Sequence, residues 1–271
     1  MTALDRVVAE VTGGEVNFPT HADVAFRVRL ALDDPDLHLA KAAQIIQAEP
    51  LLAARVVALA NSVAFRRNGR QVADVRSGVA RVGLRFVRAL ATALVMRQMA
   101  GSIRSPAFRN MATRLWEHTV HVAALAHLLA ARFRSTASDI ALFAGIVHEV
   151  SGFYLISRTD THPDLFADGS LLSAEAEATV GKAVLAALAV PAEVVAAIEV
   201  LWQQGPTVFP PRTLGDLLAL AHRLTPIASP LQRQGEEVPA LPLDPAADSQ
   251  LAEILEQSGD ELEALTSVLR Y

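Results

Sequence analysis

The feature that most constrains this chain is a helical spacing of apolar residues along nearly its whole length. In one stretch, for example, Leu39, Ala42, Ala43 and Ile46 would share one side of a helix. Hydrophobic residues make up 52% of the chain, and Ala and Leu, which are prominent among them, rank highest in helix propensity. No alternation of apolar and polar residues is long enough to predict a strand. We therefore expect an all-α fold, a compact and irregular helical bundle with a sizeable core.

Turn-forming residues such as Gly13, Gly83 and Pro191 divide this pattern into separate helices. The predicted helices span residues 4–11, 22–32, 37–48, 50–60, 75–82, 84–100, 107–132, 136–150, 173–188, 192–203 and 214–224, with one or two acidic helices within 250–269. We interpret 1–15 as an N-terminal helix, 16–228 as the main domain with halves 16–100 and 105–228, and 229–271 as a linker and an acidic helical tail.

The composition excludes several classes of protein. The chain has no cysteine, which rules out disulfides and cysteine-ligated metal sites. Its first residues contain no apolar segment of the kind found in signal peptides. No apolar run approaches the roughly 18 residues needed to span a bilayer. These observations predict a cytoplasmic protein that does not enter a membrane.

Arginine is distributed unevenly along the chain. Between Arg55 and Arg134 there are fourteen Arg, no Lys and only the acids Asp74 and Glu117, whereas the whole chain has a net charge of −5. Spacing on one helical face and in the preceding loop selects a candidate site for phosphate or an acidic partner, composed of Arg66, Arg67, Arg81, Arg85 and Arg88. Few aromatic residues lie nearby, so nucleic acid is not an expected partner. Pairing of these arginines with acids of the same chain is the alternative.

Six short segments stand out along the chain, two of which contain a histidine. They are Phe18-Pro19, Ile45 to Leu52, Leu59 to Ser62, Gly78 to Gly83, Trp116-Glu117-His118 and Phe143 to Glu149. In this order, over roughly residues 16–225, they resemble motifs of the HDOD family of bacterial signalling domains, such as "IIxxDPxL", "LxNSA", "AIxxLG", "WxHS" and "FxAGLLHD". The HDOD family is related to the HD and HD-GYP metal-dependent phosphohydrolases. The resemblance implies a compact bundle of helices.

The resemblance also identifies candidate metal ligands. An HD hydrolase requires a first His, a His-Asp pair and a distal Asp, and these map onto His118, His148, Glu149 and His222. Glu149 and His222 each replace an Asp. Such a set could bind Zn, Mn or Fe, and His121, one turn beyond His118, could join it. The alternative is that His118 and His148 are buried and hydrogen-bonded to each other or to Glu149, and our main expectation is no cofactor.

HDOD domains are thought to act mostly through protein contacts. We therefore predict a non-catalytic signalling or regulatory module that acts through a protein partner in a bacterial signal-transduction pathway. One alternative is a metal-dependent phosphohydrolase that acts on nucleotides or cyclic dinucleotides through the variant histidine and glutamate site. Another is a sensor that binds a nucleotide ligand without turning it over.

Overall fold

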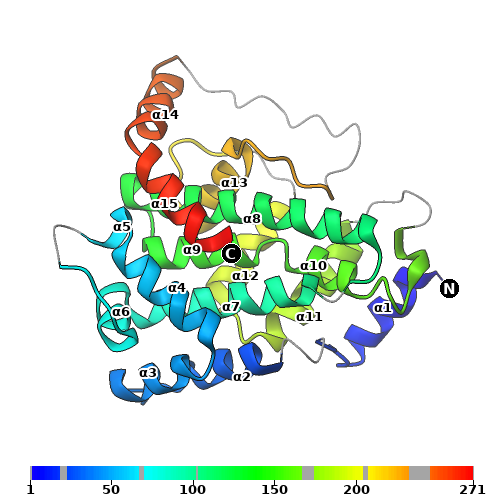
Figure 1. Cartoon of the computed structure of the whole chain (residues 1–271). Helices are drawn as coiled ribbons and strands as arrows, with labels where there is room; N and C mark the ends of the chain where they lie inside the picture. The colour runs from blue at the N-terminus through cyan, green and yellow to red at the C-terminus, as the bar shows by residue number, and fades with distance from the viewer. Residues whose placement is uncertain are drawn as a thin grey trace.

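The structure is a computed structural model that describes residues 2–18, 23–66, 70–101, 103–166, 174–203, 207–231 and 245–270. Within these ranges the regular elements are all helices, which confirms the predicted all-α class. Figure 1 shows α2 and α3 at one side of the bundle and α13 and α15 at the other, with α7, α8 and α9 between them.

The first half of the chain surrounds one long helix. Asp74 caps the start of the helix before it by accepting a hydrogen bond from the Ser77 amide, and Gly83, at a φ of 91°, turns the chain into the long helix itself. The helices of this half are α1 (Ala3–Thr12), α2 (Asp23–Ala31), α3 (Leu39–Gln47), α4 (Pro50–Asn61), α5 (Val63–Arg66), α6 (Val75–Val82) and α7 (Leu84–Gly101).

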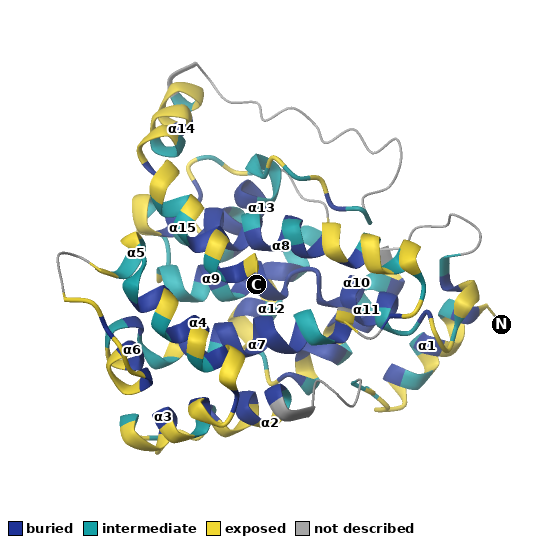
Figure 2. Cartoon of the chain, viewed as in Figure 1, coloured by how far each residue is buried: buried dark blue, intermediate teal, exposed yellow. Residues whose placement is uncertain are grey.

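The second half is organised by α8 (Pro106–Phe133) and α9 (Ser138–Val147), which pack closely together. Gly145 makes this possible, because a Cβ atom at that position would lie 2.4 Å from the Cα of Ala123 on α8. The remaining elements of this half are α10 (Val150–Ser157), a 3₁₀ turn (Pro163–Phe166), α11 (Ala174–Ala187), α12 (Ala192–Trp202) and α13 (Leu214–Leu224). Figure 2 shows buried residues concentrated on α9 and α10 at the centre of the bundle.

The C-terminal tail forms two helices, α14 (Pro245–Gln257) and α15 (Gly259–Arg270). Helix α15 buries Leu265 and Leu269 and packs against α8, α5 and α4. An arginine at its end, Arg270, donates a hydrogen bond to Nε2 of His121 on α8 (3.1 Å). Helix α14 is more exposed (Figure 2). The predicted division of the chain into domains stays a prediction.

One break in the helical pattern differs from the sequence prediction. A single helix over 136–150 was expected, but α9 ends at Val147 and α10 begins at Val150. Between them Glu149 has φ −99° and ψ 22°, which is outside the helical range. The following Ser151 and Gly152 suggest a turn by sequence, yet both lie buried inside α10. Tertiary packing therefore overrides the local propensity of these residues.

Helices α9 and α10 contradict the prediction that no apolar segment is long enough to span a membrane. The segment Ser138–Ser157 is long and apolar enough to span a membrane by length and composition, so the expectation that no segment approaches that limit was wrong. However, 83% of its apolar window is buried inside the fold. The segment therefore forms part of the core of the bundle.

Candidate metal centre

His118 is held on the inner side of α8. Ser105 precedes this helix and Pro106 occupies its first turn, where a missing N–H is tolerated. The side chain of His118 is buried, and its Nδ1 lies 2.6 Å from the carbonyl oxygen of Ile227. Because a carbonyl only accepts, Nδ1 must carry the proton, and Nε2 is left with its lone pair.

His148 is oriented in the same way at the end of α9. Its Nδ1 lies 2.7 Å from the carbonyl oxygen of Gly145, so that nitrogen is also the protonated one. Its Nε2 points at Nε2 of His118 at 3.3 Å. With both Nδ1 atoms engaged, the two Nε2 atoms are the ones free to bind a metal. Backbone carbonyls that fix the tautomer of a histidine in this way are typical of the outer sphere of metal ligands.

His222 brings a third imidazole to the same place. It lies near the end of α13, which begins with a capping box formed by Thr213 and Asp216. Its ring centroid lies 4.9 Å from that of His118 and 5.7 Å from that of His148. The sequence prediction placed this residue by resemblance alone, and the structure brings it to the other two.

Glu149 completes the cluster from the break between α9 and α10. Its Oε1 lies 3.8 Å from Nε2 of His118. Gly152, one turn further on, lets Leu231 approach the cluster. A Cβ at 152 would lie 2.2 Å from Cδ1 of Leu231, whereas its distance of 3.6 Å from Oε2 of Glu149 would be an ordinary van der Waals contact.

The geometry and charge of the cluster fit a divalent metal. One ligand atom from each of the four side chains lies within 4.8 Å of the others. In a tetrahedral zinc site with nitrogen ligands at the usual bond length, two ligand nitrogens lie about 3.4 Å apart. The Nε2 atoms of His118 and His148 are 3.3 Å apart. Burial, together with His118, lowers the pKa of His148 to about 3, and burial, together with His148 and His118, lowers that of His222 to about 3. Both rings are therefore neutral at pH 7, as metal ligation requires.

Two contacts of the cluster could not have been found by sequence reasoning. The Ile227 carbonyl and the Leu231 side chain belong to the segment after α13, and both approach the cluster. Neither has a sequence signal, since any residue supplies a carbonyl and an isolated Leu is common. His121 stays outside the cluster, because its Nε2 faces Arg270 instead.

The predicted arginine site does not assemble in the same way. Arg81 donates to the carbonyl oxygens of Ala60 (2.9 Å) and Arg70 (2.7 Å). Arg88 donates to the carbonyl oxygen of Leu32 (2.5 Å), and its Nε lies 3.6 Å from a carboxylate oxygen of Asp33.

The structure describes two of the other three members of this site. Arg85 is largely exposed, with its Nη1 3.8 Å from Asp139. Arg66 ends α5, and Arg67 lies outside the described residues. The structure thus directs two of the five arginines into internal contacts, and ligand binding by the set stays a prediction.

Comparison with known proteins identifies the family and the fold. The family model of the HDOD domain matches residues 18–203. No curated protein matches the chain. A proposed metal-dependent phosphohydrolase from Shewanella amazonensis is similar in structure, with a TM-score of 0.70, 20% identity and coverage of 98% of this chain and 97% of that one.

An HDOD domain protein of unknown function from Geobacter sulfurreducens is also similar, with a TM-score of 0.63, 20% identity and coverage of 97% of each chain. At these identities the likeness shows the fold alone.

Proposed function

The chain belongs to the HDOD family, and from this premise we propose that it is a non-catalytic signalling module of the cytoplasm that acts through a protein partner. We further propose that its histidine cluster holds one divalent metal ion, Zn, Mn or Fe, as part of the folded core. The ligands would be His118, His148, Glu149 and His222.

The orientation of the imidazoles supports the metal. His118 and His148 each hold an Nδ1 proton against a backbone carbonyl, and their Nε2 atoms lie 3.3 Å apart. A cation between these two nitrogens would stabilise this arrangement. A shared proton is the alternative, since the contact is also within hydrogen-bond distance. A divalent ion satisfies all four side chains at once.

The observation that carries the non-catalytic assignment is the burial of this cluster. His118 is 1% exposed, His148 3% and Glu149 7%. Leu231 packs over Gly152 beside Glu149, so the segment after α13 covers the cluster on that side. His222 is half-buried, so within the described residues the cluster offers a phosphate ester little exposed surface, whereas a structural ion requires none. A metal ion held by four buried or half-buried ligands is typical of a structural site, in which the ion stabilises the folded protein.

A metal-dependent phosphohydrolase is the second candidate, and the ligand geometry is the specific observation that favours it. A bound divalent metal would supply Lewis acidity and a more acidic bound water. In that case Glu149 and the three histidines would orient the ion, and the covering segment would have to move to admit substrate. The proposed hydrolase of Shewanella amazonensis has the same fold, which is compatible with this candidate.

Metal analysis of the purified protein by plasma mass spectrometry tests the proposal, with His148→Ala as the comparison variant and His162→Ala as the control. Near-stoichiometric metal in the wild type and the control, lost in His148→Ala, is the expected result. No metal, even after incubation with Mn²⁺, Fe²⁺ and Zn²⁺, would remove the metal from the proposal.

The loaded protein is then assayed for hydrolysis of bis(p-nitrophenyl) phosphate and of cyclic dinucleotides. No turnover is expected. Turnover that disappears in His148→Ala would establish the hydrolase instead. A nucleotide that raises the melting temperature equally with and without chelator would favour the sensor that binds nucleotide without turnover.

A further inference from the structure

Two buried arginines in the first half of the molecule have opposite surroundings. Arg29 on α2 is 2% exposed, and its guanidinium donates to Oγ1 of Thr92 (2.7 Å), pairs with Asp33 and lies over the ring of Phe143. Arg55 on α4 is 7% exposed, yet within the described residues it forms no hydrogen bond and no ion pair. Its Nη1 is fully buried without an acceptor.

A guanidinium in this state is unfavourable for the free protein. Buried charges in proteins are normally paired, because desolvation of an unpaired ion is costly. The charges nearest to Arg55 are those of Arg97, which has the same sign, and Glu49. Glu49 is already engaged at the start of α4, where its Oε2 accepts from the amides of Leu51 (3.0 Å) and Leu52 (3.3 Å).

The exposed face of α4 beside Arg55 is apolar. On a helical wheel Leu51, Ala54 and Ala58 share this face, and all three are exposed, Leu51 to 55%. They leave α4 with no charged residue pointing to solvent. Arg55 lies at one edge of the face, between the exposed positions and the buried Leu59.

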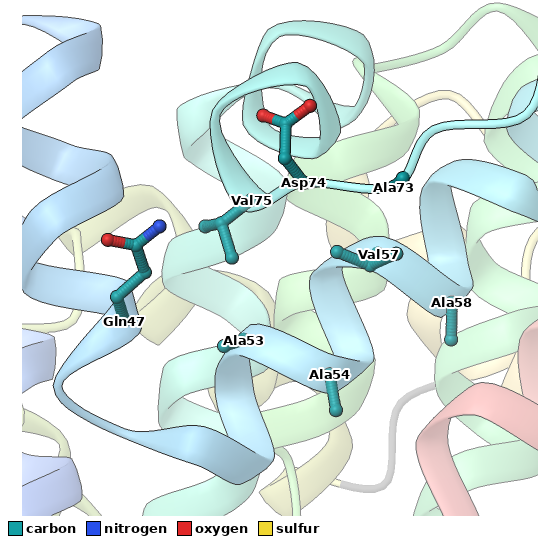
Figure 3. Close-up of a pocket in the computed structure, with 8 residues that line it drawn as sticks. All are labelled: Gln47, Ala53, Ala54, Val57, Ala58, Ala73, Asp74 and Val75. Carbon is teal, nitrogen blue, oxygen red and sulfur yellow. The ribbon is translucent and has the colours of Figure 1, made fainter.

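At the opposite edge the face opens into a shallow groove, shown in Figure 3. Ala53, Ala54, Val57 and Ala58 of α4 form its floor, while Gln47 and the start of α6 form its walls (Figure 3). Asp74 on the α6 side is occupied by capping that helix. Small side chains on the floor allow another backbone to approach closely.

We infer that the exposed face of α4 docks an amphipathic helix of a partner protein, and that an acidic side chain of that helix pairs with Arg55. The inference rests on the proposed function through a protein partner and names the surface used. The apolar groove suits the apolar side of such a helix. The guanidinium of Arg55, which lacks an acceptor for Nη1 and feels the like charge of Arg97, calls for an acidic residue on that helix. Arg55 can reach the carboxylate by a small movement of its flexible side chain toward the adjacent edge.

Substitution of the two arginines in the isolated protein provides the first test. Arg55→Met should raise the melting temperature by about 2–4 °C, since it removes an uncompensated buried charge. Arg29→Met should lower it by about 6 °C or more, since it leaves Asp33 and Thr92 without their partner. A similar loss in both variants would show that Arg55 is a structural residue and would overturn the inference.

The second test identifies what binds. A photo-crosslinking amino acid replaces Ala54 in the full chain, expressed in the cells of origin, and an identical probe at the exposed Glu193 on α12 is the control. Mass spectrometry of the crosslinked peptide should reveal an amphipathic, acid-rich segment of one protein. Arg55→Met should reduce its yield at least tenfold, and Arg55→Lys should retain part of it.

Four outcomes would overturn the assignment of this surface. The crosslinked species could be a segment without acidic residues, a second copy of this chain or nucleic acid. Alternatively, Arg55→Met could leave the crosslinking yield unchanged. If the probe at Glu193 captures a partner and the probe at Ala54 does not, action through a protein partner stands and α4 is not its surface. The result does not depend on the metal, so failure of the metal proposal would be seen separately.

Discussion

The histidine cluster is predicted from a family resemblance and the arginine face from helical spacing, and the tertiary structure treats the two sets differently. His118 on α8, the adjacent His148 and Glu149 after α9, and His222 on α13 meet, with ligand atoms within 4.8 Å. The arginines come from one stretch of chain, and Arg81 and Arg88 turn to backbone carbonyls and an acid of the same molecule. Arginines close in sequence are thus partly directed into internal contacts, whereas the four candidate ligands from distant parts of the chain converge into one cluster.

Among the substitutions that test this difference, Gly145→Ala should have the largest effect on stability and on the histidine cluster. The new Cβ would lie 2.4 Å from the Cα of Ala123, and a backbone contact of that kind can be relieved only by separating α8 from α9. We expect a loss of about 3–5 kcal/mol in the free energy of unfolding and weaker metal retention, because His118 and His148 move apart. Urea unfolding and metal analysis measure the two effects.

Gly101→Ala is the matched control for this variant. Gly101 is the last residue of α7, and a Cβ there would meet nothing within 4 Å. Its stability should change by less than about 1 kcal/mol. If the two glycine variants are equally stable, the close approach of α8 and α9 does not hold the histidines together.

The metal-free cluster should also make stability depend on pH. Burial, with the neighbouring histidines, lowers the pKa of His148 and of His222 to about 3 in the folded protein, while an unfolded histidine titrates near pH 6.5. Between these values the unfolded chain binds more protons, so stability is constant above about pH 7 and falls as the pH drops from 6.5 toward 3. The slope should be about 1.4 kcal/mol per pH unit for each histidine.

Urea unfolding in the presence of chelator at pH 7.5, 6.5 and 5.5 measures this slope. His222→Gln should lower it by about 1.4 kcal/mol per pH unit, whereas Arg85→Gln should leave it unchanged. His121 and His127, whose pKa values are also lowered by burial, would contribute the remainder together with His148. A slope that survives in the double variant of His148 and His222 would have to arise elsewhere in the molecule.

The arginine face should respond unevenly to truncation. Arg88→Ala removes the hydrogen bond to the Leu32 carbonyl and the charge near Asp33, and should lower stability by about 1–3 kcal/mol. Arg85→Ala should have little effect, because the side chain is exposed and its pair with Asp139 is long. Equal losses in thermal unfolding would contradict the division of this face into internal and exposed members.

The sequence predicts features that depend on neighbouring residues better than features that depend on contacts between residues far apart in the chain. The helices near 75–82, 84–100 and 214–224 are confirmed almost to the residue, since the periodicity and caps that define them are local. The break at Glu149 and helix α10 were missed, because Ser151 and Gly152 favour a turn until packing buries them. The position of Arg88 beside Leu32 was also out of reach, since that contact joins residues far apart in sequence.

The sequence by itself therefore determined the helical class, the family and the identity of the four candidate ligands. Only the tertiary structure decided that these ligands converge, that the carbonyls of Ile227 and Gly145 fix their tautomers, and that Arg29 is paired while Arg55 is not. The physical reason is that apolar periodicity reports which side of a helix is buried. It carries no information about which distant group will lie against that side, and the chemistry of a site depends on that group.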